Sequence, residues 1–138
     1  MSRLIAPLTL IAVLAIAGCR AAPMYSASDI AFAEPPASVQ KVLTMEDYKN
    51  AILRGGTKRG WTFQEEGPGH LVGNLAVRNK HFATVDVTFD TQKFSISYKS
   101  SQNLNYNAGR SEIHPNYNSW IRNLQNDIQA EITLLKAT

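Results

Sequence analysis

The sequence has 138 residues, which is enough for one domain and leaves no room for a second lobe. Its formal net charge is +3, and a balance this mildly basic gives no reason by itself to expect a nucleic-acid partner. The single cysteine excludes an internal disulfide and a metal site built from several cysteines.

Residues 4–18 form an apolar run that follows Arg3 and ends in Ala-Gly directly before Cys19. Small residues before a cysteine are typical of a lipobox, where a peptidase cleaves the chain and the thiol is acylated. We therefore predict a lipoprotein signal peptide over 1–18 and attachment of a fatty acid such as palmitate at Cys19. The alternatives are a secretory signal without a lipid and a membrane anchor, although the run is shorter than the roughly 20 residues that a spanning helix needs.

Residues 19–38 are rich in Ala, Pro and Ser and show no apolar periodicity, so we expect a flexible tether here. Flexible chain of this length spans about 25 Å, from about 5–6 Å times the square root of its length. The alternative is that Ile30 and Phe32 dock on the domain as a short edge strand. The globular domain is expected over 39–138.

Thr44 is predicted to begin a helix, because its hydroxyl can cap the first backbone amides and two acidic residues follow it. The predicted apolar face consists of Met45, Tyr48 and Ile52, with Ala51 and Leu53 at its margin. The glycine pair 55–56 costs about 2 kcal/mol relative to two alanines inside a helix. The helix therefore either ends near Arg54 or continues to Arg59, with Gly60 as a left-handed cap.

Apolar and polar residues alternate in four runs between Trp61 and Lys99, which is typical of an antiparallel meander with one buried face. Opposed residues must share a face, so the length of each link sets the register. The expected pairs are Val77 with His81, Leu75 with Ala83, Gly73 with Val85, Phe89 with Phe94, Val87 with Ile96, and Trp61 with Gly73, whose missing side chain leaves space for the indole. Val72 and Phe82 interrupt the polar face, either as ordinary exposed residues or as the middle of a partner site.

A polar loop over 100–114 is followed by Pro115, which suits the first position of a helix. The helix carries an apolar stripe made of Tyr117, Trp120, Ile121, Leu124, Ile128, Ile132 and Leu135. All these elements together predict a two-layer α+β fold with the order α-β-β-β-β-α. In it, both helices cover one face of a four-stranded antiparallel meander.

The loop and the start of the last helix are the most site-like feature, because amide and phenol groups can hydrogen bond to a peptide or sugar and an indole can stack on it. The candidate binding residues are Tyr106, His114, Asn116, Tyr117, Asn118 and Trp120. The alternative is that Tyr117 and Asn118 tie the loop and the sheet edge to the helix.

Other chemistry has little support in the sequence. The histidines are dispersed, and Asp86 and His81 project to opposite faces of one strand, so we expect no catalytic residues, no metal site and no cofactor. A group of cations is either a basic corner for anionic lipid or glycan, or an ordinary solvated surface. Its members are Arg54, Lys58, Arg59, Arg78 and Lys80.

The turn Arg59-Gly60-Trp61 and the Asn- and Tyr-rich segment 98–124 resemble a family of short proteobacterial lipoproteins. The resemblance covers about residues 40–130; it implies a lipidated cell-envelope protein and supplies no activity. Inner-membrane retention signals commonly have Asp directly after the lipid-bearing cysteine. This chain has Arg20 there, and in this it resembles lipoproteins that are sent to the outer membrane. We expect a non-enzymatic outer-membrane lipoprotein whose periplasmic domain binds an envelope protein or glycan. A small envelope hydrolase with a converging His and carboxylate, or a purely structural spacer, is the alternative.

Overall fold

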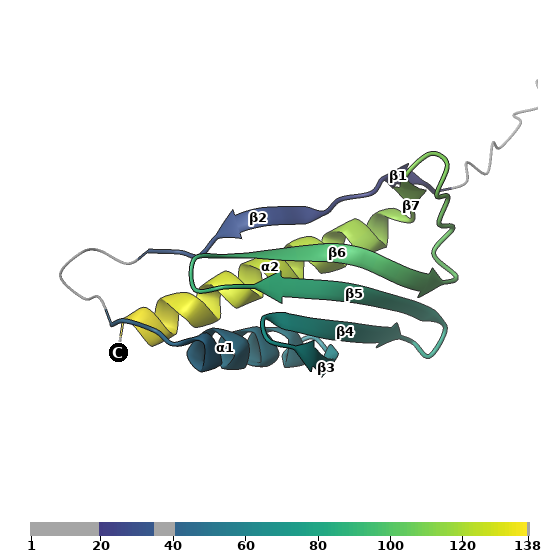
Figure 1. Cartoon of the computed structure of the whole chain (residues 1–138). Coiled ribbons are helices and arrows are strands. Elements are labelled where there is room, and N and C mark those ends of the chain that lie inside the picture. Colours follow the sequence, from purple (N-terminus) through teal and green to yellow (C-terminus); the bar gives the residue numbers. More distant parts are fainter. Residues whose placement is uncertain (1–19, 35–40, 138) are drawn as a thin grey trace, which may run out of the picture.

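The computed structural model describes residues 20–34 and 41–137, so the predicted signal peptide and Cys19 lie outside the described residues. The fold is α+β, with two helices, a five-stranded antiparallel sheet and a small two-stranded sheet (Figure 1). The elements are β1 (Ala22–Pro23), β2 (Ala27–Ala31), α1 (Met45–Thr57), β3 (Thr62–Gly67), β4 (His70–Val77), β5 (His81–Phe89), β6 (Lys93–Gln102), β7 (Glu112–Ile113) and α2 (Pro115–Lys136). The strand order is β2-β6-β5-β4-β3 in the larger sheet, and β1 pairs with β7. The predicted class is confirmed, but the expected count of four strands was wrong.

Both helices lie on the same side of the larger sheet, and the core fills the space between these two layers (Figure 1). From the helices, the fully buried side chains are Ala51, Ile52, Tyr117, Ile121, Leu124, Ile128 and Ile132. From the sheet they include Leu71, Val85, Val87, Phe94 and Ile96. The apolar stripe predicted for α2 therefore faces the sheet, with Trp120 and Leu135 partly buried at its margins.

The register of the central strands agrees with the one predicted from the lengths of the links between them. Every expected pair across β4–β5 and β5–β6 is present. The predicted pairing of Trp61 with Gly73 was wrong, because Phe63 lies opposite Gly73 and Trp61 precedes β3. A Cβ atom on Gly73 would lie 2.9 Å from the Phe63 ring, so the glycine does leave space for an aromatic side chain, two residues further along the strand.

Helix α1 begins as predicted, because the Thr44 hydroxyl accepts from the Asp47 backbone amide and the Asp47 carboxylate accepts from the Thr44 amide. The hydrogen bonds that Asp47 accepts from the Thr44 amide and, with a smaller effect, from the Thr44 hydroxyl lower the pKa of its carboxyl. The helix continues through both glycines to Thr57, and Gly60 follows with a φ of 92°. A Cβ atom on Gly55 would lie 3.0 Å from the backbone nitrogen of Ile128, so this glycine lets α1 and α2 approach closely.

The predicted tether is wrong for the part of it that the structure describes. Strand β2 pairs with β6 at the edge of the sheet, and Phe32 is buried between Tyr48 and Phe94, with ring centroids 4.4 and 5.1 Å away. The edge-strand alternative for Ile30 and Phe32 is therefore confirmed. The physical reason is that the apolar side chains of this Ala-rich segment complete the core beside β6.

The helix-free face of the sheet is polar, as the alternation predicts. Val72 is 8% exposed, because its cross-strand neighbours Gln64 and Asp86 flank it, so the alternative of an ordinary exposed residue was wrong for Val72. Phe82 is half-buried beside Thr84, whose hydroxyl donates to Asn74 Oδ1 at 2.8 Å. In the described parts of the chain, neither helix is long and apolar enough to cross a bilayer.

Candidate functional site

The predicted binding residues at the start of α2 have structural partners. His114 is the N-cap, and its Nδ1 accepts from the Asn116 backbone amide at 3.1 Å. Asn118 is buried; its Nδ2 donates to the Pro23 carbonyl at 2.9 Å and its Oδ1 accepts from the Tyr25 amide at 2.8 Å. Asn118 thus ties the N-terminal segment to the helix, and the side chain of Asn116 is exposed nearby.

The rings of three tyrosines contact one another at the polar loop. Tyr106 is 40% exposed, and its ring centroid lies 4.1 Å from that of Tyr98, which in turn meets Tyr117 edge-on at 5.8 Å. Tyr117 is fully buried, and its hydroxyl has no hydrogen-bond partner among the described residues. Burial raises the pKa of Tyr117, so this phenol stays neutral and is covered from any ligand on the surface.

A pocket of about 460 Å³ lies beside Trp120, the one predicted binding residue among its lining groups. It is lined by Arg59, Trp61, Leu75, Ala76, Val77, Arg78, Trp120 and Asn123. Three parts of the fold meet here: the segment between α1 and β3, the end of β4 with its turn, and the second turn of α2. The pocket thus combines two indole rings with guanidinium and amide donors.

The two arginines of this pocket differ in their partners. Arg59 Nε donates to Asp127 Oδ2 at 2.5 Å, and this contact raises the pKa of Arg59. Arg78 is exposed, holds a φ of 54°, and has no ion pair within the parts of the chain that the structure describes. Arg78 is therefore the cation available to a ligand.

Two other predicted cations of the basic corner, Arg54 and Lys58, are neutralised by α2, whereas Lys80 is exposed and has no ion pair within the described residues. Arg54 Nε lies 3.1 Å from Glu131 Oε2, and Lys58 pairs with the other oxygen of the same carboxylate. Lys58 lowers the pKa of Glu131, with a smaller effect from Arg54. The sequence does place Asp127 and Glu131 on one face of α2, because they are spaced i,i+4. It does not indicate that the cations of α1 lie opposite that face.

A histidine–carboxylate pair that was not predicted from the sequence lies on the helix-free face of the sheet. His70 Nε2 is 2.7 Å from Asp86 Oδ1, and Lys99 Nζ approaches the same oxygen at 3.5 Å. The predicted register could have revealed the pair, because it places Asp86 diagonally across from His70 on β5. Within residues 20–34 and 41–137, no three His, Cys, Asp or Glu side chains are grouped closely enough to hold a metal ion.

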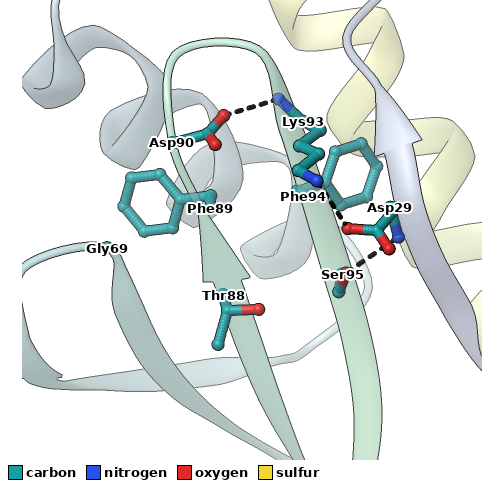
Figure 2. Close-up of a pocket in the computed structure, with 8 residues that line it drawn as sticks. All are labelled: Asp29, Gly69, Thr88, Phe89, Asp90, Lys93, Phe94 and Ser95. Carbon is teal, nitrogen blue, oxygen red and sulfur yellow. Dashed lines mark hydrogen bonds and ion pairs between the residues drawn. The ribbon is translucent and has the colours of Figure 1, made fainter.

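A smaller hollow of about 190 Å³ lies at the opposite end of the sheet, where β2 meets β6 (Figure 2). Lys93 Nζ lies 3.0 Å from Asp29 Oδ1, and the Asp29 amide donates to Ser95 Oγ at 2.9 Å. Asp90 accepts from the backbone amides of Gln92 and Lys93, which lowers the pKa of Asp90. These contacts hold the edge strand and close the hairpin.

Comparisons with protein-family models, curated proteins and solved structures found no match to this chain. The resemblance to short lipoproteins therefore stays a prediction.

Proposed function

We propose that this chain is a lipid-anchored protein of the cell envelope, exported to the outer membrane, whose folded domain binds a carboxylate-bearing glycan without catalysing a reaction. The lipobox ending at Cys19 and the resemblance to short lipoproteins support the anchor. The pocket beside Trp120 supports the binding role.

The observation that carries the binding role is the combination of groups around this pocket. The partly buried indole ring of Trp120 offers a flat apolar face, on which sugar rings stack, whereas the Trp61 ring that also lines the pocket is only 1% exposed. Arg78 supplies an unpaired guanidinium for a carboxylate, and Asn123 supplies an amide for hydroxyl groups. A neutral sugar would leave the charge of Arg78 unused, so the acidic glycan fits better.

Binding is tested with the lipidated full chain in detergent and soluble carboxylate-bearing fragments of the cell-wall glycan, followed by calorimetry. The variants Trp120→Ala and Arg78→Asn should each weaken binding at least about tenfold, which corresponds to about 1.4 kcal/mol. Asparagine at position 78 tolerates the left-handed backbone, so that variant removes charge with little strain. Tyr106→Ala, an exposed aromatic outside the pocket, is the control. No binding, or equal affinity of the Trp120→Ala and unaltered chains, would contradict the proposal.

The anchor is tested separately by growing cells with labelled fatty acid. The label should enter the unaltered chain and be lost in Cys19→Ala. Label that persists in this variant would rule out the proposed attachment site.

A small envelope hydrolase is a second candidate, because His70 and Asp86 do converge. No side-chain hydroxyl among the described residues is hydrogen bonded to His70, so the pair lacks an aligned nucleophile and the binding role is favoured. Release of product from ester, amide or glycoside substrates that is abolished by His70→Gln would establish the hydrolase instead.

A further inference from the structure

The chain is bound to the domain almost immediately after the predicted lipid-bearing residue. Ala22 lies opposite Ile113 and Pro23 opposite Glu112, in the pairing of β1 with β7. The Met24 amide then donates to the Ser111 carbonyl at 2.8 Å. From Ala22 onward, therefore, the segment runs along the domain and is not a free tether.

Helix α2 holds the same segment from the other side. Both polar atoms of the Asn118 side chain bond to its backbone, at Pro23 and Tyr25. The Tyr25 hydroxyl donates to Gln125 Oε1 at 2.5 Å, and the Arg122 guanidinium lies over the Tyr25 ring, 4.4 Å from its centroid. These contacts fix the direction in which the chain leaves the domain toward Cys19.

The remaining reach is short. Three residues of fully extended chain span at most about 11 Å, so an anchor on Cys19 lies within about that distance of Ala22. Helix α2 has 22 residues and is therefore about 33 Å long, and its first turn lies at the β1–β7 end (Figure 1). An anchor with so short a reach brings this end of the domain, and not the other, to the bilayer.

The surface around β1 and β7 includes the loop 103–111 and the β4–β5 turn. The Asn103 side chain donates to the Lys80 carbonyl at 2.7 Å, and the His81 ring bonds to the Asn103 carbonyl at 2.8 Å. Asn107 pairs with Glu112 of β7. The turn, the loop and the N-terminal segment thus form one continuous end of the molecule.

This end carries exposed cations without carboxylate partners. Arg20, Lys80 and Arg110 are exposed, and none of them forms an ion pair within the described residues, whereas Glu112 is a half-buried carboxylate here. At the opposite end, Lys93 is paired with Asp29 and Lys136 with Glu34, and Lys41 is an exposed cation without an ion pair within the described residues. Cations beside a bilayer are attracted to anionic headgroups.

We propose that the basic end, defined by Arg20, Lys80, Arg110 and the loop 103–111, lies against the anionic headgroups of the bilayer that holds the anchor. The docked N-terminal segment sets this orientation, and the cations stabilise it. The proposal rests on lipid attachment at Cys19, which belongs to the proposed function.

The test uses the lipidated full chain reconstituted into phosphatidylcholine vesicles with phosphatidylglycerol and with a headgroup-quencher lipid. Acylation of Cys19 consumes its thiol, so one introduced cysteine carries the fluorophore. Ala108→Cys places it on the loop of the basic end, and Thr91→Cys places it on the exposed β5–β6 turn at the other end. Emission from the label at 108 should be quenched, while the label at 91 should keep its emission. Equal quenching, or stronger quenching at 91, would overturn the proposal.

Two sets of variants in the Ala108→Cys background separate the causes. Asn118→Ala, which releases the segment, should reduce quenching at 108, whereas Asn116→Ala, two residues earlier and exposed, should not. Lys80→Gln with Arg110→Gln should reduce it in vesicles with phosphatidylglycerol, and Lys41→Gln at the other end should not. Quenching at 108 that is unchanged in both the Asn118→Ala and the Lys80→Gln/Arg110→Gln chains would overturn the proposed contacts.

Fatty acid on the same samples is measured by mass spectrometry. A chain that carries no fatty acid at Cys19 overturns both the anchor and the orientation. A chain that carries it and shows equal quenching at the two labels overturns the orientation alone.

Discussion

Phe63 shows how a single side chain accounts for glycines far apart in the sequence. Its ring lies where a Cβ atom on Gly56 would approach to 2.3 Å and one on Gly73 to 2.9 Å. Both glycines weaken their own helix or strand, and both are explained by packing against one phenyl ring.

The Tyr117 hydroxyl is buried in the core and has no hydrogen-bond partner among the described residues. Replacing Tyr117 with Phe removes a buried, unsatisfied polar group and keeps the ring against Tyr98. We expect Tyr117→Phe to raise the free energy of unfolding by about 1 kcal/mol. Urea denaturation compares the two chains, with Tyr106→Phe, an exposed ring, as the control. A clear loss of stability in Tyr117→Phe would show that the hydroxyl is satisfied.

At the scale of elements, the contact between α1 and α2 explains why the basic corner of the sequence is not a free anion site. The close approach at Gly55 brings the C-terminal half of α1 beside Asp127 and Glu131 of α2. Cations from the end of α1 then find their partners on the neighbouring helix. The charges favoured by the helix dipole at that end thus also hold the two helices together.

Gly55→Ala tests this close approach. The added Cβ atom would meet backbone atoms of Asp127 and Ile128 at 3.0–3.2 Å, so the helices must move apart. We expect overpacking of about 1–3 kcal/mol, partly offset by about 1 kcal/mol of helix propensity gained over glycine. Thermal unfolding should show a net loss of stability. Gly67→Ala, where a Cβ atom meets nothing within 4 Å, should be neutral or stabilising. Equal stability of the two variants would contradict the proposed role of Gly55.

At the scale of the whole molecule, stability should depend on acid through carboxylates that the fold holds ionised. Lys58 and Arg54 lower the pKa of Glu131 below its ordinary value of 4.5. A carboxyl with a depressed folded-state pKa contributes stability that is present above its unfolded pKa. That stability is lost as the pH falls through the folded value.

We therefore expect Glu131→Gln to be less stable than the unaltered chain near neutral pH, by about 1–2 kcal/mol. The difference should shrink as the pH falls below 4.5. Urea denaturation at a series of pH values measures it. Glu66→Gln changes an exposed carboxylate without a recorded partner in the described chain, and it should leave the pH dependence unchanged. A gap that stays constant at acid pH would contradict the role given to Glu131.

Local patterns in the sequence were sufficient for the elements and for much of their pairing. Thr44 caps its helix, Pro115 begins the other, and the β4–β5 and β5–β6 registers follow from link parity. Each of these depends on neighbouring residues, because capping, helical spacing and strand alternation are short-range properties.

Contacts between distant residues needed the tertiary structure. Residues 22–34 have a composition typical of a linker, and they are ordered because Asn118, Gln125 and the edge of β6 supply partners about 60 to 100 residues away. Likewise, Arg59 is paired with Asp127, whereas Arg78 has no ion pair in the described chain. No local pattern in the sequence predicts this difference. The sequence by itself determined the helices and the meander, and it predicts the anchor. The tertiary structure decided where residues 22–34 dock and which cations stay free, because both depend on which surfaces the fold brings together.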